Sequence, residues 1–86
     1  MKMNELKDTI ELMTRDDYKD RFKAEYYQLK IRLTKLKTML SKWDSNELEF
    51  VPTCPRAMYD TQVYGMEQYL TVLEERAQME GIDLGW

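Results

Sequence analysis

The sequence has no histidine, and its only cysteine is Cys54. Zinc sites built from thiolates and imidazoles need several such residues, and serine–histidine catalysis needs a histidine, so both kinds of chemistry are excluded. The three glycines, Gly65, Gly81 and Gly85, are scattered, and they form neither a phosphate-binding loop nor a dinucleotide-binding fingerprint. Since the lone cysteine has no disulfide partner in the chain, we expect a reducing, intracellular setting.

Long apolar runs are also missing. No run approaches the roughly 20 residues of a membrane span, and no signal peptide opens the chain, so we expect no membrane contact. The 86 residues are 43% hydrophobic and 34% charged, which is typical of one small globular domain covering residues 1–86. Because a chain of this size buries only about 60–65% of its unfolded surface, self-association would add core.

The formal net charge of −3 conceals a separation of signs along the chain. Between Lys19 and Lys42, eight basic residues stand against two acidic ones, whereas from Pro55 onward six acidic residues stand against two arginines. This pattern has two interpretations. The basic segment could bind nucleic acid or phosphate, or the two segments could be helices that neutralise each other.

The spacing of apolar residues favours the two helices. Each segment carries a seam with alternating spacings of 4 and 3, as in paired helices. The first seam comprises Phe22, Tyr26, Leu29, Leu33, Leu36, Leu40 and Trp43. The second comprises Tyr59, Val63, Met66, Leu70, Leu73 and Ala77.

These seams predict an all-α protein, an antiparallel helical hairpin with helices at residues 17–43 and 55–81. Pro52 cannot continue a helix, so residues 44–54 form the loop, and Pro55 is tolerated in the first turn of the second helix. Gly81 followed by Ile82 predicts a left-handed helix stop with an apolar clasp, which leaves residues 82–86 as a tail.

An antiparallel register that sets Leu40 opposite Tyr59 pairs apolar residues in every layer. It also sets lysines opposite carboxylates along one flank, which specifies the alignment. The expected pairs are Lys37 with Asp60, Lys30 with Glu67 and Lys23 with Glu74. Since the second helix neutralises most of the basic segment, we do not expect nucleic-acid binding.

Apolar residues remain outside these seams. Residues 1–15 form an amphipathic arm that carries Leu6, Ile10 and Met13, and the second helix carries a stripe at seven-residue intervals. We expect the arm to pack on this stripe, in its own chain or in a neighbour. A three-helix monomer and an intertwined homo-oligomer both satisfy that packing, and the small size favours the homo-oligomeric bundle. The stripe, which would join the arm in the oligomer interface, comprises Met58, Gly65, Val72 and Met79.

One polar flank combines cations, amides and an aromatic ring. It could bind a nucleotide or another phosphate-bearing ligand, because Arg and Lys hold phosphates and a ring stacks on a base. The alternative is a polar oligomer interface without a ligand. The candidate ligand-binding residues are Gln28, Arg32, Lys35, Gln62, Tyr69 and Arg76. We find no catalytic residues, metal ligands or cofactor motif, because paired acids such as Glu74 and Glu75 point in different directions on a helix.

Two segments carry a resemblance to a known family. The first comprises Asp17-Tyr18-Lys19-Asp20-Arg21-Phe22-Lys23-Ala24-Glu25-Tyr26, Gln28-Leu29, Arg32-Leu33 and Lys35-Leu36. The second comprises Thr53-Cys54-Pro55, Gln68-Tyr69-Leu70, Leu73-Glu74-Glu75-Arg76-Ala77 and Glu80-Gly81-Ile82. They are similar to the two helices of a widespread family of small phage proteins related to a crAss-like-phage gene product.

This resemblance implies a viral accessory protein in the host cell cytoplasm. Such proteins often counter host defence by binding, either to a defence protein or to the cyclic nucleotide that activates it. We therefore expect a non-enzymatic, oligomeric sponge that sequesters a cyclic nucleotide or another phosphate-bearing signal. The alternative is a helical protein-binding module, in which the arm or the stripe docks on a host or phage protein.

Overall fold

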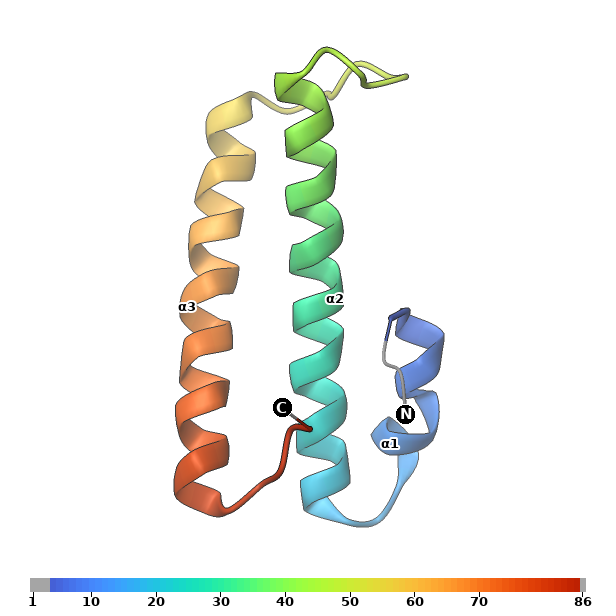
Figure 1. The fold of residues 1–86 in the computed structure, drawn as a ribbon, viewed down its shortest axis with the longest axis vertical. Coiled ribbons are helices and arrows are strands. Elements are labelled where there is room, and N and C mark those ends of the chain that lie inside the picture. Colours follow the sequence, from blue (N-terminus) through green and yellow to red (C-terminus); the bar gives the residue numbers. More distant parts are fainter. Residues whose placement is uncertain (1–3, 86) are drawn as a thin grey trace.

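The computed structural model describes residues 4–85, and over that range every regular element is helical. A 3₁₀ turn, η1 (Leu6–Thr9), leads directly into the short helix α1 (Ile10–Thr14). The two long helices are α2 (Tyr18–Asp44) and α3 (Arg56–Glu80), which run side by side in opposite chain directions (Figure 1). The predicted all-α class is confirmed. Residues 1–3 of the predicted arm lie outside the described residues.

Local chemistry explains where the long helices begin and end. The Asp17 side chain caps α2 by accepting a 2.9 Å hydrogen bond from the Lys19 backbone N–H. After α2, Asn46 adopts a left-handed backbone with φ 58°, a conformation that asparagine tolerates. At the end of α3, Gly81 is left-handed at φ 68°, and the Ile82 N–H donates to the Ala77 carbonyl at 2.8 Å. This ending is a Schellman motif, so the predicted helix stop at Gly81 is confirmed.

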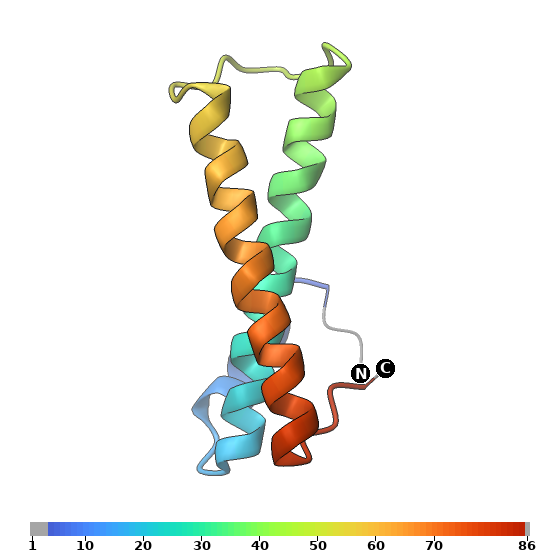
Figure 2. The ribbon, with the colours of Figure 1, turned by 90° about the vertical axis from the view of Figure 1, so that its left-hand side faces the viewer.

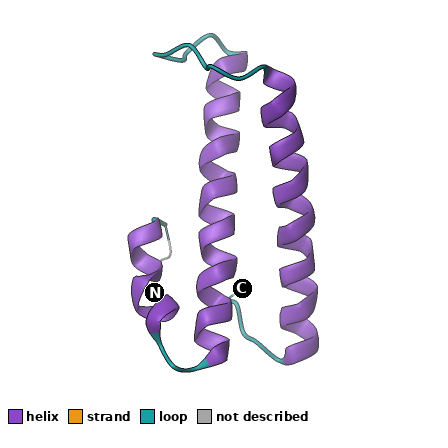
Figure 3. Cartoon of the chain, turned by 180° about the vertical axis from the view of Figure 1, so that it is seen from behind, coloured by secondary structure: helices purple, strands orange, loops and turns teal. Residues whose placement is uncertain are grey.

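The core lies at the end of the hairpin that holds both chain termini. Seam residues of α2 and α3 form one buried cluster there, and Tyr26 and Leu73 have no exposed surface. The tail folds back under the helices, and Ile82 and Leu84 complete the cluster. Figure 3, from behind, shows this tail returning toward α2. The other members of the cluster are Phe22, Leu29 and Ala77.

Toward the loop the two helices bury less apolar surface between them. Figure 2 shows that α2 and α3 cross, with their loop ends separated in that view. The seam residues of α3 there are only half-buried, whereas Leu33 and Leu40 of α2 remain buried. The half-buried positions are Tyr59, Val63, Met66 and Leu70.

The N-terminal arm packs against α2 and makes no contact with α3 within the described part of the chain. The predicted packing of the arm on the Met58 stripe of its own chain is therefore wrong. The outer face of α2 offers an apolar surface, Ala24 and Ile31, which are 2% and 6% exposed. Packing on the stripe of a neighbouring chain stays a prediction.

The arm also turns a different face inward than its sequence spacing suggested. Thr9 and Leu12 are 1% and 8% exposed and Leu6 is half-buried, whereas Ile10 and Met13 are 52% and 45% exposed. A 3₁₀ helix has about three residues per turn, so residues three apart share one face. The expected face of Leu6, Ile10 and Met13 assumed α-helical spacing throughout.

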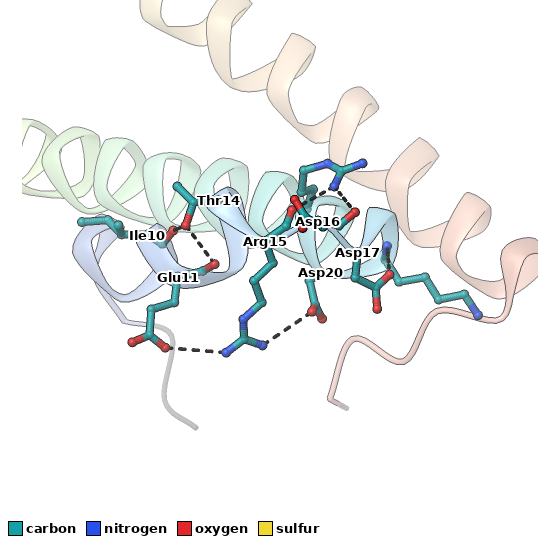
Figure 4. A network of polar contacts seen from close by, with 9 residues as sticks. Ile10, Glu11, Thr14, Arg15, Asp16, Asp17 and Asp20 are labelled. Atoms are coloured by element: carbon teal, nitrogen blue, oxygen red, sulfur yellow. Dashed lines mark hydrogen bonds and ion pairs between the residues drawn. The ribbon is translucent and has the colours of Figure 1, made fainter.

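Two arginines fix the angle between α1 and α2 (Figure 4). Arg15 bridges the two helices, with its guanidinium 3.6 Å from Glu11 Oε2 and 3.5 Å from Asp20 Oδ2. Arg21 donates from Nη1 to the backbone carbonyls of Arg15 and Asp16. These contacts tie the short connection between α1 and α2 to the first turn of α2.

The ion pairs between the long helices differ from the predicted ones. Glu67 meets Lys37 Nζ at 3.6 Å instead of Lys30. Asp60 pairs within its own helix, with Arg56 at 3.0 Å, and Glu74 accepts a hydrogen bond from the Tyr26 hydroxyl at 3.1 Å. Long, exposed side chains reach more than one turn along a helix, so seam register does not fix their partners.

Candidate functional site

The candidate site is the flank of the hairpin on which Tyr69 and Arg76 lie. Both residues stand on one face of α3, since seven residues span about two helical turns. The Tyr69 hydroxyl donates to the Glu25 carboxylate of α2, so this face of α3 borders the α2 face that carries Glu25. Tyr69 is 45% exposed, and the Arg76 side chain is 46% exposed, so the flank is an open surface.

Arg76 is the centre of a hydrogen-bonded network at this flank. Its Nε lies 3.2 Å from Glu80 Oε2, and its Nη2 donates to the Tyr18 hydroxyl at 2.9 Å. Tyr18 in turn donates to Glu80 Oε1 at 2.8 Å, and the Arg76 guanidinium lies 5.0 Å from the centre of the Phe22 ring. The guanidinium is thus held in one orientation. Five N–H donors are present on a guanidinium, and these contacts engage only Nε and Nη2.

The network raises the pKa values of its two tyrosines and of its arginine. The pKa of Tyr69 is raised by its hydrogen bond to Glu25 and by partial burial, and the nearby Arg76 opposes this rise. The hydrogen bond to Glu80 and partial burial likewise raise the pKa of Tyr18. Partial burial works against a charged Arg76, but its contacts with Glu80 and Tyr18 raise the pKa of the guanidinium. The flank therefore presents a cation and neutral hydroxyl groups at physiological pH.

The other predicted ligand residues are spread more widely. Gln28 donates to Thr9 Oγ1 at 3.0 Å and to Met13 Sδ at 3.3 Å, so its amide binds the arm. Lys35 borders a surface cavity of about 280 Å³ on the arm side of α2. Arg32 is exposed two turns beyond Glu25, and the amide of Gln62 lies 3.8 Å from Met66 Sδ. Of the six predicted ligand residues, only Tyr69 and Arg76 are shown to influence each other, through the effect of the Arg76 charge on the pKa of Tyr69.

Tyr18 and Glu80 belong to this network, but sequence reasoning did not select them. A signal was present in the spacing, because Tyr18, Glu25 and Arg32 are seven residues apart on α2. Glu80 stands four residues after Arg76, the separation at which opposite charges meet on a helix.

The predicted apolar stripe lies beside this flank and is exposed. Met58, Val72 and Met79 are 61%, 50% and 83% exposed. Apart from its two chain neighbours and the adjacent backbone of α3, a methyl group added at Gly65 would meet no heavy atom of the described chain within 4 Å. The stripe is therefore an uncovered apolar surface next to Tyr69 and Arg76.

The opposite flank offers different chemistry. A shallow cavity of about 420 Å³ there is bordered by Tyr26 and Lys30 of α2 and by Thr71, Glu74, Glu75 and Gln78 of α3. Its two carboxylates disfavour an anionic ligand. Within residues 4–85, no three acidic or cysteine side chains lie close enough together to hold a metal ion. Over the same residues, the helices lack an apolar stretch that could cross a membrane.

Comparison with known proteins gave one family. Searches of curated proteins and of solved structures found no match. The family model described as Sequestin matches residues 16–79, a segment that runs from the cap of α2 almost to the end of α3. It includes both helices of the candidate flank. The chain therefore belongs to the Sequestin family.

Proposed function

We propose that the protein is a non-enzymatic phage protein that sequesters a cyclic nucleotide immune signal of the host as an oligomer. The observation that carries this proposal is the pairing of half-exposed Tyr69 and Arg76 on one flank of the hairpin. The family name, Sequestin, is compatible with a sequestering role. The resemblance to small phage proteins supplies the viral context, and the cytoplasm of the infected host cell is part of the proposal.

The flank offers the contacts that a nucleotide needs. The Arg76 guanidinium can donate two parallel hydrogen bonds to a phosphate, and Arg32 adds a second cation from α2. The Tyr69 ring can stack on a base. Since Glu25 and Glu80 balance the two arginines, net charge does not drive binding. Directed donors and stacking would supply the affinity, and they act more strongly when a second chain excludes water.

The first test is mass spectrometry of the protein purified from cells that produce cyclic nucleotides. Under native conditions, we expect an oligomer with extra mass, and under denaturing conditions the intact ligand should be released. A nucleotide released as a degraded product would contradict a sequestering role and indicate an enzyme. Failure to bind any member of a panel of cyclic di- and trinucleotides at millimolar concentration would overturn the proposal.

The second test assigns the site. Arg76→Gln should weaken nucleotide binding about tenfold or more, because a charge-assisted donor to phosphate is lost. Lys37→Gln is the matched control, since it removes an exposed cation from the opposite flank, where Lys37 pairs with Glu67. Isothermal titration calorimetry measures both affinities. Equal losses in the two variants would mean that general charge, and not this flank, binds the ligand.

A protein-binding module is the second candidate function, and the exposed apolar residues of the arm favour it. Ile10 and Met13 face solvent although the arm itself is packed on α2. Ile10→Asp should abolish capture of a protein partner without unfolding the hairpin, since this side chain is outside the core. Unchanged capture by this variant would exclude the arm as the docking surface.

A further inference from the structure

Gly65 has no packing role within the described part of its own chain. It lies in the interior of α3 with a helical backbone, although glycine is unfavourable in a helix compared with alanine. Apart from its two chain neighbours and the adjacent backbone of α3, no heavy atom of the described chain lies within 4 Å of the position that its Cβ would occupy. Neither backbone conformation nor packing in the monomer therefore explains this residue, but close approach of an external helix would.

We propose that the apolar stripe is a two-fold interface in which α3 of a second copy packs antiparallel on α3. Gly65 of each chain would receive the second copy's Val72, and Met58 would pack on the second copy's Met79. This inference deepens the proposed function, because the second copy would complete the ligand-binding flank. The partner is a second copy of the same chain, because two stripes that run in opposite directions place Gly65 against Val72 and Met58 against Met79.

Three features of the stripe support this antiparallel register. The antiparallel register gives every member of the stripe a partner. Gly65, which has no side chain, lies opposite the branched side chain of the second copy's Val72. A parallel pairing would leave Gly65 opposite Gly65, without side-chain contact at the position where the helices can come closest. It would also place Arg76 opposite Arg76, whereas the antiparallel register places Arg76 near the second copy's Thr61 and Glu75 near its Gln62.

The N-terminal arm of the same chain does not compete for this surface. It is held on α2 by the hydrogen bonds from Gln28 to Thr9 and Met13 and by the bridging contacts of Arg15. The stripe is consequently left uncovered, with Met79 83% exposed. An isologous contact of this type closes on two copies and does not lead to open polymers.

The register also completes the candidate site. Its two-fold axis passes between Gln68 and Tyr69, so the Tyr69 side chains of the two copies lie on either side of the axis. Each Arg76 lies seven residues beyond its own Tyr69, which is about 10 Å along the helix. Two aromatic rings between two guanidinium groups form a symmetric surface that a single chain lacks. A ligand with phosphates on both sides of a base fits this arrangement.

The test uses Gly65→Ala, which should stabilise the monomer but weaken the dimer. In a free helix, alanine is more favourable than glycine, so the melting temperature of the monomer should rise. In the dimer, the added methyl groups separate the helices, so the dissociation constant should increase about tenfold or more. Gly65→Leu should weaken the dimer further. Sedimentation velocity over a concentration series measures self-association, and thermal melting of dilute samples gives monomer stability.

Tyr64→Ala is the control, because Tyr64 is 68% exposed on a different face of α3 and should leave self-association unchanged. A protein that stays monomeric at about 100 µM in the presence and absence of nucleotide would overturn the interface. So would a dimer that Gly65→Leu leaves intact. A dimer that dissociates with Ile10→Asp but not with Gly65→Leu would show that the arm, and not the stripe, forms the interface.

The same measurements separate this interface from the proposed function. A Gly65-dependent dimer that binds no cyclic nucleotide would support the interface and overturn sequestration. A monomer that binds nucleotide through Arg76 would overturn the interface and leave sequestration intact.

Discussion

The two ends of the hairpin contain the same kind of seam but bury it to different extents. At the end with the termini, Leu73 is fully buried and Ala77 is 1% exposed. At the loop end, Val63 and Met66 occupy equivalent seam positions of α3 and are only half-buried. Heptad spacing therefore selects which residues face the other helix, but it does not determine how completely they are buried.

The difference comes from additional layers. At the end with the termini, Ile82 and Leu84 of the tail close the core, and the arm covers the outer face of α2. The Tyr27 hydroxyl donates to the Leu84 carbonyl and ties the tail to α2. At the loop end, no third element joins α2 and α3 in the part of the chain that the structure describes (Figure 2). Two helices alone leave the α3 positions of the seam half open, although Leu33 and Leu40 of α2 are buried.

The largest effect is expected from the same substitution made at each end. Leu73→Ala should lower the free energy of unfolding by about 3–5 kcal/mol, because it leaves a cavity in a closed core. Leu36→Ala removes the same atoms from a half-buried position toward the loop and should cost about 1–2 kcal/mol, since solvent and neighbours can fill the space. Urea unfolding followed by circular dichroism measures both, and equal losses would refute the distinction between the ends.

Sequence alone was sufficient for the long helices and for the end of α3. Alternating spacings of 4 and 3 predict α2 and α3, and the pair Gly81 and Ile82 predicts the Schellman motif. These features depend on local chemistry, which the sequence records directly. Burial of Leu84 was not predicted, because the tail has no periodic pattern and its position depends on tertiary contacts.

The arm and the candidate site show where sequence reasoning fails. The arm mixes 3₁₀ and α-helical turns, so Thr9 and Leu12 replace Ile10 and Met13 on its inner face. The flank of Tyr69 and Arg76 follows from heptad spacing, but their partners could not be read from the seam register. Flexible polar side chains choose among several neighbours within reach, and small energy differences decide the choice.

A smaller effect is expected at the loop end from the contacts of Arg56 with Asp44, Trp43 and Asp60, which we call the clamp. Arg56 lies 3.2 Å from Asp44 Oδ2 through Nη2 and 5.3 Å from the Trp43 ring, and it pairs with Asp60 at 3.0 Å. The hydrogen bond from Arg56 lowers the pKa of Asp44 below 3.8. A lowered folded-state pKa stabilises the fold above pH 3.8, and this contribution is lost as the pH falls through the lower folded value.

Arg56→Gln should therefore return the pKa of Asp44 to about 3.8 and remove this acid dependence. NMR titration of the Asp44 carboxyl measures the pKa, and thermal melts between pH 2 and about 6 measure the dependence. The matched control is Lys42→Gln, which removes a nearby cation that has no ion pair among the described residues. An unchanged Asp44 pKa in the Arg56 variant would show that the clamp does not form in solution.

The smallest effect is expected at high pH, from the polar network at the better packed end. The pKa of Tyr69 is raised above 10 by its hydrogen bond to Glu25 and by partial burial. A raised folded-state pKa means that the stabilisation is complete below pH 10 and is lost as the pH rises through the folded value. Tyr69→Phe should reduce the loss of folding stability as the pH rises above 10. Tyr18→Phe should have a similar effect, because it removes the hydrogen bond of Tyr18 to Glu80. Tyr64→Phe is the control, because Tyr64 is 68% exposed. The difference in tyrosinate absorbance between the unsubstituted protein and Tyr69→Phe should show Tyr69 ionising above pH 10, and ionisation at pH 10 would mean that the Glu25 contact is absent in solution.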